Sequence, residues 1–536
     1  MSFKNIYLVI LLIGGVFCSA NLVAQKTDST FIDVNYVRRQ NIWTYSKNAA
    51  GLKHFKLSKV SNAEVFLDKS NGEFKNFHQS NNSYEYGLKT NSIYRLNDKI
   101  VFDGEIAYSK FKGENMGGST FIDPYKNPFD IVELDDNNKG SKGLETYNLS
   151  GALSAQLSSK LAIGGLINYQ AANFAKAKDL RHINKLLDMD LSVGGIYQIN
   201  NLIEIGATYN YDRRIESVFF KAYGNFQRGF ASLINFGSFL GTLESFGESG
   251  YTQENATRPL TNFGHGFSVQ LNFNIGEKTQ FFNEFTYSQP KGFFGEKGTA
   301  SYLFTEHTSG KYSYQSVLAI SRGKNEHQIA LSANYCDLAN HENIFRRETN
   351  PGGISRIVYF GQRDVLERQE LNASLAYTLF KNIKYNNPVW EFNLIADYFR
   401  RQQTTNLYPF YRDQTINSYQ ANVNVKRNMI KAKEMYSFAI GLGYGSGSGI
   451  AKYDGLHVAP SSSQAAPTSM DLYLYQEFEY FTKPRVMADI SLQYTKKMKQ
   501  NIAPYAKLSY NYTKAFDTQF LGGSFGIAGA SVGCNF

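Results

Sequence analysis

Histidines and a glycine-rich stretch are the first places to look for chemistry in this sequence. The eight histidines are scattered, and none has the His-Glu-x-x-His spacing of a zinc site. His182 lies in RHINK (181–185), which we interpret as a solvated loop. GSGSG (445–449) follows a predicted strand but opens a serine-rich stretch and not a helix, so it is not a phosphate-binding loop. We therefore predict no catalytic residue, no metal, no cofactor and no enzymatic activity.

An acidic segment is the remaining candidate for a metal site. FIDPYKNPFDIVELDDNN (121–138) gathers five carboxylates, and calcium favours such oxygen clusters. Their spacing is not that of an EF-hand loop, and we interpret the segment as a solvated outer loop. Because barrel enzymes with histidine-based sites exist, an outer-membrane hydrolase stays as an alternative.

The elements that would position any site are alternating strands. In TYNLSGALSAQL (146–157) apolar residues alternate with small polar ones, and the pattern returns in VMADISLQY (486–494) and in many other segments, 470–480 among them. Short turns such as 158–160 alternate with long connections at 111–143, 213–264, 337–368 and 446–469. The sequence therefore predicts an all-β fold, a single antiparallel transmembrane β-barrel of about 18 strands (range about 14 to 18), with short periplasmic turns and long extracellular loops.

The N-terminus predicts export. Lys4 precedes an apolar run that is too short to span a bilayer and is followed by small residues, as in a secretory signal peptide. We predict a signal peptide at 1–24, an N-terminal periplasmic arm at 25–54 and a transmembrane β-barrel at 55–536. The predicted location is the cell outer membrane, where the barrel contacts lipid and lipopolysaccharide.

Charge is unevenly distributed over the predicted barrel. The chain carries a net charge of +10, but the positions predicted to face the lumen are mostly acidic. Charges along a narrow path set the selectivity of a pore, so an open lumen should favour cations. The residues predicted to set this selectivity are Asp397, Asp489, Glu204 and Glu391.

The basic excess must lie in loops and at rims, where three arginine pairs stand near the ends of strands. Arginine binds phosphate through two parallel hydrogen bonds. The residues predicted to bind lipopolysaccharide phosphate are Arg213, Arg214, Arg346, Arg347, Arg400 and Arg401. An exported barrel seldom meets nucleic acid, so we predict no nucleic-acid partner.

Two segments have more than one interpretation. The connection 213–264 is rich in phenylalanine and glycine, and a loop that apolar should not stand in water. It folds into the lumen as a constriction, docks a partner, or forms two long strands above the membrane. IWTYSKNAAGL (42–52) either tucks into the barrel as a small plug or forms an irregular arm.

The C-terminal GIAGASVGCNF alternates small and apolar residues up to a final phenylalanine. An unpaired edge of this kind would be adhesive, so we predict that the last strand closes the barrel against the first. An alternating strand that ends in an aromatic residue resembles the signal that outer-membrane barrels present to the barrel assembly machinery. The resemblance implies this role for Phe536 and Val532.

The start AQK after the signal peptide, IWTYSKNAAGL, the recurring hairpins and the terminal phenylalanine resemble an uncharacterised family of Bacteroidota outer-membrane β-barrels. Some members of such families accompany TonB-dependent receptors and surface lipoproteins in nutrient uptake, so the resemblance implies such partners. Too few residues precede the first strand for the plug domain of those receptors. We predict a channel or accessory component for uptake of solutes; the alternative is a non-conducting scaffold that docks surface lipoproteins or a larger outer-membrane complex.

Overall fold

The computed structural model describes residues 31–224, 229–247, 250–276, 278–296, 301–349, 351–353, 355–384, 386–498 and 502–536. The predicted signal peptide at 1–24 lies outside the described residues. Within the described part of the chain, no helix is long and apolar enough to cross a membrane.

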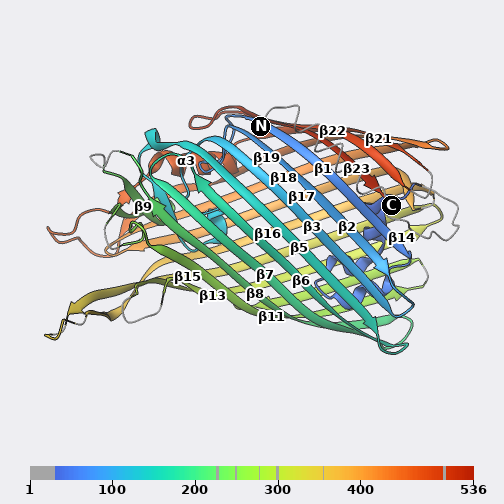
Figure 1. Ribbon diagram of the computed structural model, residues 1–536, viewed down its shortest axis with the longest axis horizontal. Coiled ribbons are helices and arrows are strands. Elements are labelled where there is room, and N and C mark those ends of the chain that lie inside the picture. The colour runs from blue at the N-terminus through green and yellow to red at the C-terminus, as the bar shows by residue number, and fades with distance from the viewer. Residues whose placement is uncertain are drawn as a thin grey trace.

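The described strands form one closed antiparallel barrel of eighteen strands (Figure 1), as predicted. One strand is interrupted at Gln289 and Pro290, where proline has no N–H to give to a neighbouring strand, so it is divided into β12 and β13. The barrel strands are β1 (Lys59–Gly72), β2 (Asn82–Arg95), β3 (Ile100–Met116), β5 (Gly140–Gln156), β6 (Leu161–Lys176), β7 (Arg181–Gln198), β8 (Ile203–Lys221), β11 (Thr257–Ile275), β12 (Thr279–Ser288) with β13 (Lys291–Gly295), β14 (Leu303–Arg322), β15 (Asn325–Thr349), β16 (Ser355–Lys384), β17 (Asn387–Leu407), β18 (Phe410–Ile430), β19 (Glu434–Leu456), β21 (Arg485–Lys496), β22 (Ala503–Ala515) and β23 (Ser524–Asn535).

The last strand closes the barrel against the first. β23 pairs antiparallel with β1 from Asn62 opposite Asn535 to Gly72 opposite Phe525. The backbone of Phe536 adds two hydrogen bonds to Ser61. No strand edge of this pair is left open, which confirms the predicted closure.

Alternation along the strands separates an apolar outer face from a polar lumen. Outward residues such as Leu149, Phe267 and Leu492 are exposed, whereas neighbouring inward residues such as Gln270 are buried. The predicted inward and outward positions on these strands are therefore confirmed. An exposed apolar band around a closed sheet is typical of a barrel in a lipid bilayer.

The two ends of the barrel differ. Most connections at the end with the C-terminus, called here the turn end, are short, such as 157–160 between β5 and β6. The long connections lie at the opposite, loop end, where β9 and α3 are found (Figure 1). They fold into a second small sheet with the order β20, β10, β9, β4. The elements at this end are β4 (Asp130–Glu133), β9 (Ala231–Gly237), β10 (Leu240–Ser245), β20 (Thr468–Ser469), α3 (Asp471–Thr482), and the short 3-10 helices η4 (Pro124–Lys126) and η5 (Asp136–Asn138).

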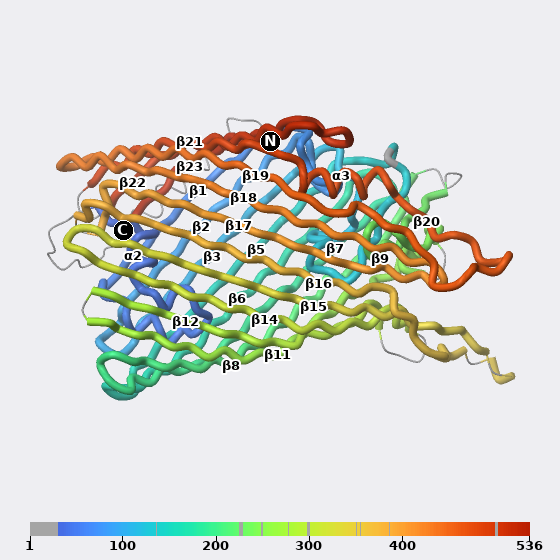
Figure 2. Tube along the Cα trace, turned by 180° about the vertical axis from the view of Figure 1, so that it is seen from behind, coloured from blue at the N-terminus to red at the C-terminus, as the bar shows by residue number. Residues whose placement is uncertain are grey.

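Two predicted elements differ in the structure. The strand predicted at 470–480 is the helix α3. The long loop predicted at 337–368 is instead mostly a hairpin of β15 and β16, which extends beyond the rest of the barrel (Figures 1 and 2).

The segment before the first strand lies inside the turn end of the barrel. It forms α2 (Val34–Gln40) and two short 3-10 helices, η2 (Ile42–Tyr45) and η3 (Ala49–His54). Figure 2 shows α2 near the C-terminus and β20 at the far end. The N-terminal segment and the infolded loops thus occupy opposite ends of one lumen.

Candidate functional site

The N-terminal segment 31–58, which we call the plug, is built from three capped helical turns. Asp33 accepts hydrogen bonds from two backbone N–H groups at the start of α2. Asn41 and Asn48 cap η2 and η3 in the same way. Aspartate and asparagine are favoured at these positions because their side chains satisfy free backbone donors. The capping residues therefore favour short helices in this segment, which has no strand alternation.

The plug is basic and the wall around it is acidic. Residues 31–58 hold five lysines or arginines and one aspartate. The Arg38 guanidinium donates two hydrogen bonds, of 3.0 and 2.8 Å, to the carboxylate of Asp103 on β3. The other plug–wall ion pairs are Arg39–Glu391 at 3.3 Å, Lys47–Asp190 at 3.3 Å, Lys53–Glu204 at 3.0 Å and Asp33–Lys426 at 2.7 Å. These partners lie on five strands around the barrel, so the plug crosses the lumen.

These ion pairs differ in burial, and burial decides which of them matters most. Lys53 and Glu204 are only 9% and 2% exposed, whereas Lys47 and Asp190 are 53% and 35% exposed. An exposed pair contributes about 0–1 kcal/mol. Removing one partner of a buried pair costs about 3–5 kcal/mol, because the other charge is left buried without compensation. Lys53 is therefore the electrostatic anchor of the plug.

Asp33 carries the one acidic charge of the plug and pairs with Lys426 of the wall. Burial alone would raise the pKa of Asp33, but the Lys426 ammonium and two backbone N–H donors outweigh it and lower the pKa below its ordinary value. A lowered carboxyl pKa stabilises docking above the ordinary pKa, and this contribution is lost as pH falls through the lowered value.

Two apolar clusters complete the docking of the plug. One joins plug residues Val37, Leu52 and Phe55 to wall residues Val60, Ile93 and Val101. The other surrounds Trp43. Trp43 is buried and packs edge-on against Phe282 of β12, with ring centroids 5.0 Å apart. Gly164 of β6 lets η3 lie directly on the wall, because a Cβ there would be 2.3 Å from the Ala50 nitrogen. The same core includes Ile42, Ala162, Ile196 and Val317.

The loop end is closed by a different structure, which we call the lid: the connections 117–139, 222–256 and 457–484 as far as the structure describes them. Phe236 and Phe239 of the phenylalanine-rich segment are buried, and Phe230 and Phe246 pack against the same core. The side chains of this core belong to both the infolded loops and the inner wall. These phenylalanines therefore form a constriction and not an exposed docking surface. Phe226 lies outside the described residues.

Helix α3 fits into the lumen because β19 is glycine-rich on its inner face. A Cβ at Gly447 would lie 2.8 Å from the Thr482 Cα at the end of the helix. This is the structural role of the GSGSG stretch. The residues of α3, DLYLYQEFEYFT, alternate in the way that predicts a strand. Close packing against the glycines of β19 stabilises the helix instead.

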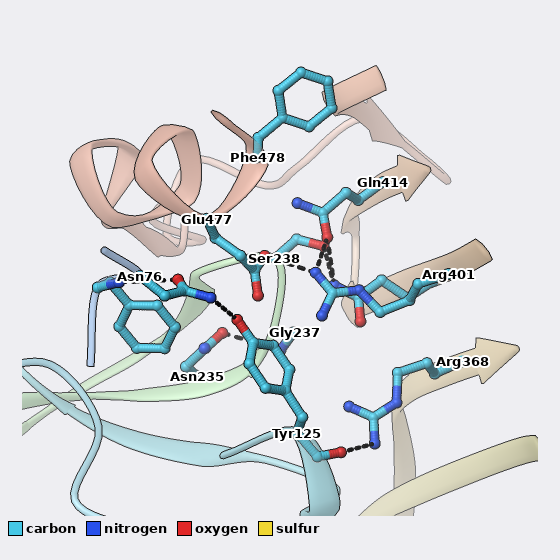
Figure 3. Close-up of polar contacts among 12 residues, drawn as sticks. Asn76, Tyr125, Asn235, Gly237, Ser238, Arg368, Arg401, Gln414, Glu477 and Phe478 are labelled. Atoms are coloured by element: carbon cyan, nitrogen blue, oxygen red, sulfur yellow. Dashed lines mark hydrogen bonds and ion pairs between the residues drawn. The ribbon is translucent and has the colours of Figure 1, made fainter. Parts of the chain in front are cut away.

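A polar cluster lies inside the lid (Figure 3). The Arg401 guanidinium donates a hydrogen bond of 2.6 Å to the Glu477 carboxylate, and the two side chains are 3% and 5% exposed. Arg368 donates to the backbone carbonyl of Asn127 at 3.0 Å, and the Tyr125 hydroxyl accepts a bond from Asn76. These residues line a cavity of about 40 Å³. Both side-chain polar atoms of Asn127, Oδ2 of Asp130 and Nε of Arg401 are buried there without a partner.

A larger cavity of about 720 Å³, which we call the chamber, lies between plug and lid. Strand β17 gives the order along the lumen: Glu391 contacts the plug, Asp397 lines the chamber, and Arg401 contacts the lid. Strand β15 gives the same order, with Glu326 bonded to the plug, Asn334 in the chamber and Asn340 against the lid loop. The chamber is therefore a candidate binding space on the axis of the lumen.

The predicted selectivity residues occupy different places. Glu204 and Glu391 are paired with the plug, so they are not free to select ions while it is docked. Asp397 accepts a hydrogen bond of 2.7 Å from Ser374 and faces the chamber, and Asp489 lies beside Gly441 of the inner wall. The sequence predicted the acidic wall of the lumen but not the plug that pairs with it. The excess of lysine and arginine in residues 31–58 was the signal that pointed to such a partner.

The arginine pairs require a correction. Arg214 faces the lumen and binds Asp188 and Glu216, and Arg401 is buried against Glu477. Successive residues of a barrel strand point to opposite faces, so Arg213 and Arg214 cannot both face outward, and neither can Arg400 and Arg401. Arg214 and Arg401 are therefore removed from the predicted lipopolysaccharide collar. The exposed arginines for which it stays a prediction are Arg213, Arg346, Arg347 and Arg400.

Other predicted residues are also placed by the structure. Val532 faces outward, and Phe536 is exposed at the turn end, with the Lys59 ammonium 4.8 Å from its ring. The two interpretations of solvated loops are wrong: His182 is buried in β7, and 121–138 is folded into the lid with Asp130 buried. Burial raises the pKa of Asp130 to about 7. No cluster suited to a metal ion is found among the described residues.

A family model matches residues 49–536, which include the end of the plug and the whole barrel. The chain belongs to the family of unknown function DUF6850. No curated protein matches the sequence. Because the function of this family is unknown, membership does not assign a role to the barrel.

Solved structures with a similar fold are receptors and channels. The ferric preacinetobactin receptor BauA of Acinetobacter baumannii is 8% identical, with a TM-score of 0.39 over 90% of this chain and 80% of that chain. A mutant of the ferric enterobactin receptor PfeA of Pseudomonas aeruginosa is 10% identical, with a TM-score of 0.38 over 89% and 80%. A mutant of the monoaromatic hydrocarbon channel TodX is 10% identical, with a TM-score of 0.31 over 91% and 92%. Likeness at this level carries no argument about function.

Proposed function

We propose that this protein is an outer-membrane channel for uptake of a small solute, closed from the turn end by the plug. The observation that carries the proposal is the chamber of about 720 Å³, which lies between plug and lid along the lumen. Pockets of about 300–1,000 Å³ suit small-molecule ligands. The lid narrows the passage, and the plug, which is held mainly by ion pairs, is the part that moves.

The outer surface supports an outer-membrane location. Phe267, Val269 and Ile275 on one strand are 64%, 58% and 61% exposed. A band of that kind around a whole barrel is stable only against lipid. In such a membrane the turn end would face the periplasm and the long loops would face the outside.

The proposal is tested by the permeability of proteoliposomes. The protein, its Lys53→Met variant and its Lys47→Gln variant are reconstituted, and osmotic swelling is recorded in glycine, glucose and sucrose. We expect the Lys53→Met vesicles to swell fastest, because the plug has lost its buried anchor. Lys47→Gln should resemble the unmodified protein, because that pair is exposed. Equal swelling of all three, with the plug released in Lys53→Met, would contradict a channel closed by the plug.

A second candidate function is a scaffold that docks a surface lipoprotein. The hairpin of β15 and β16 favours it, because Ile344, Tyr359 and Phe360 lie in its outer part and are exposed. Replacing these three residues by Ser should abolish site-specific crosslinking from the hairpin to a lipoprotein partner in cells. An unchanged crosslinking pattern would exclude this hairpin as the docking surface.

A further inference from the structure

The chamber has an aromatic side. Phe399 of β17 and Phe481 of α3 are stacked with ring centroids 5.3 Å apart and an interplanar angle of 29°. Phe74 and Tyr480 form a second stacked pair, at 5.5 Å and 25°. All four residues line the chamber. Stacked pairs hold their rings in fixed planes, so they offer flat apolar surfaces to a ligand.

The chamber is also lined by polar side chains of β15, β16 and β18, on both sides of Phe399 and Asp397 of β17. These side chains are hydroxyls and amides, which both donate and accept hydrogen bonds. They are Ser332, Asn334, Asn372, Ser374 and Gln420. The charged lining residues are Asp397, which accepts from Ser374, and Arg485, which donates to the backbone carbonyls of Tyr480 and Phe481. These two residues are opposite in sign, so the lining of the chamber carries no net charge.

The small cavity in the lid adjoins the chamber through a cluster of rings and a guanidinium. The Arg401 guanidinium carbon lies 5.6 Å from the Tyr125 ring centre and 5.9 Å from that of Phe481. Beyond this cluster, donors and acceptors are buried side by side without partners: Nδ2 and Oδ1 of Asn127, Oδ2 of Asp130 and Nε of Arg401. Arg401 and Glu477 neutralise each other there. A ligand that satisfies these groups must both donate and accept.

We propose that the chamber and the adjoining lid cavity bind neutral polyhydroxylated molecules, that is, small sugars and sugar alcohols. Hydroxyl groups both donate and accept, which suits the amide and hydroxyl wall and the unpaired atoms in the lid. The C–H faces of a sugar ring suit the stacked aromatic pairs. A charged solute of the same size would lose hydration and meet a lining with no net charge to compensate for it. This inference rests on the proposed function, because it names the class of solute that the channel takes up.

Saturation-transfer NMR on the full-length protein tests the inference, in a detergent without a sugar headgroup. The probes are glucose, galactose, mannose, xylose and mannitol, with gluconate and glucosamine as charged molecules of matched size. We expect saturation of the C–H protons of at least one neutral probe, several-fold above that of the charged pair. Signal confined to the charged probes, equal signal for both groups, or no signal from any neutral probe would overturn the inference.

Three variants locate the signal. Phe481→Leu removes an aromatic ring from the lining of the chamber, and Asn334→Leu removes a polar group from it. Each variant should lose most of the saturation transfer to the neutral probes. Phe520→Leu is the matched control, because Phe520 stacks on Tyr475 and is not among the residues that line the chamber. Transfer that survives both chamber variants would overturn the site. If the proteoliposomes swell as expected but no neutral probe shows saturation transfer, the solute class is wrong and the channel stands. If neutral probes show saturation transfer but the proteoliposomes do not swell, the proposed channel function is wrong.

Discussion

The plug and the lid close the same lumen by opposite physical means. The plug is basic, meets an acidic wall through ion pairs on five strands, and packs two small apolar clusters against the wall, one around Trp43 and one around Phe55. The lid is held by an extended apolar core in which residues of three loops pack with residues of the wall. The described part of the lid also holds buried ion pairs, among them Arg401–Glu477 and Lys176–Glu133.

This difference teaches which end is suited to move. Ion pairs at a partly wet interface are weakened by salt and by acid, and they re-form without loss of a packed core. An apolar core is disrupted only at the cost of exposing many side chains to water. The plug is therefore the removable element and the lid the fixed constriction. Each variant or condition that follows alters either the plug or the lid, and the response of both elements is measured.

The largest effect is expected from Phe236→Ala in the lid. Phe236 is fully buried, and such a truncation costs about 3–5 kcal/mol. Hydrogen exchange of residues 231–245 should become faster, whereas Trp43 emission at the other end should not change. Leu243→Ala, on an exposed position of the same sheet, is the control. A shift of Trp43 emission in Phe236→Ala would show that lid and plug form one unit.

The next largest effect is expected from Lys53→Met in the plug. It leaves Glu204 buried, with a ring nitrogen of His54 at 3.2 Å and the amide of Asn272 at 3.1 Å, so plug docking should weaken by about 3 kcal/mol. Trp43 is buried in the docked plug, and with Trp390→Phe it becomes the sole tryptophan. Its emission should shift to the red in the Lys53→Met variant.

Lys47→Gln serves as the matched control, because the Lys47–Asp190 pair is largely exposed and should contribute less than about 1 kcal/mol. Its Trp43 emission should stay at the unmodified value. Equal shifts in both variants would mean that burial does not rank the ion pairs of the plug.

A smaller effect is expected from salt. Raising the ionic strength from about 0.1 to 1 M shortens the Debye length from about 10 to 3 Å. The half-exposed pairs Arg38–Asp103 and Arg39–Glu391 should weaken, and amide exchange in the plug should become several-fold faster. The lid should not respond, because its core is apolar. Faster exchange in the lid alone would reverse the assignment of the moving part.

Much of the fold could be predicted from the sequence because strand alternation is a local signal of period two. The helix α3 could not, since its residues also alternate and its conformation depends on contact with Gly447 across the lumen. The arginine pairs were misplaced although the alternation rule applied to them. Of the site, the acidic wall was predicted, but its plug partner and the chamber depend on which distant segments meet inside the barrel.

The central claim is that a docked, ion-paired plug closes an acidic lumen. The most direct measurement is the current through the Lys53→Met variant in a planar bilayer under a salt gradient, beside the unmodified protein. The account predicts channel openings that are frequent only in the variant, with a cation-selective reversal potential that moves toward zero when Asp397 and Asp489 are changed to Asn. Absence of openings while Trp43 emission reports a released plug, or an anion-selective potential, would contradict it.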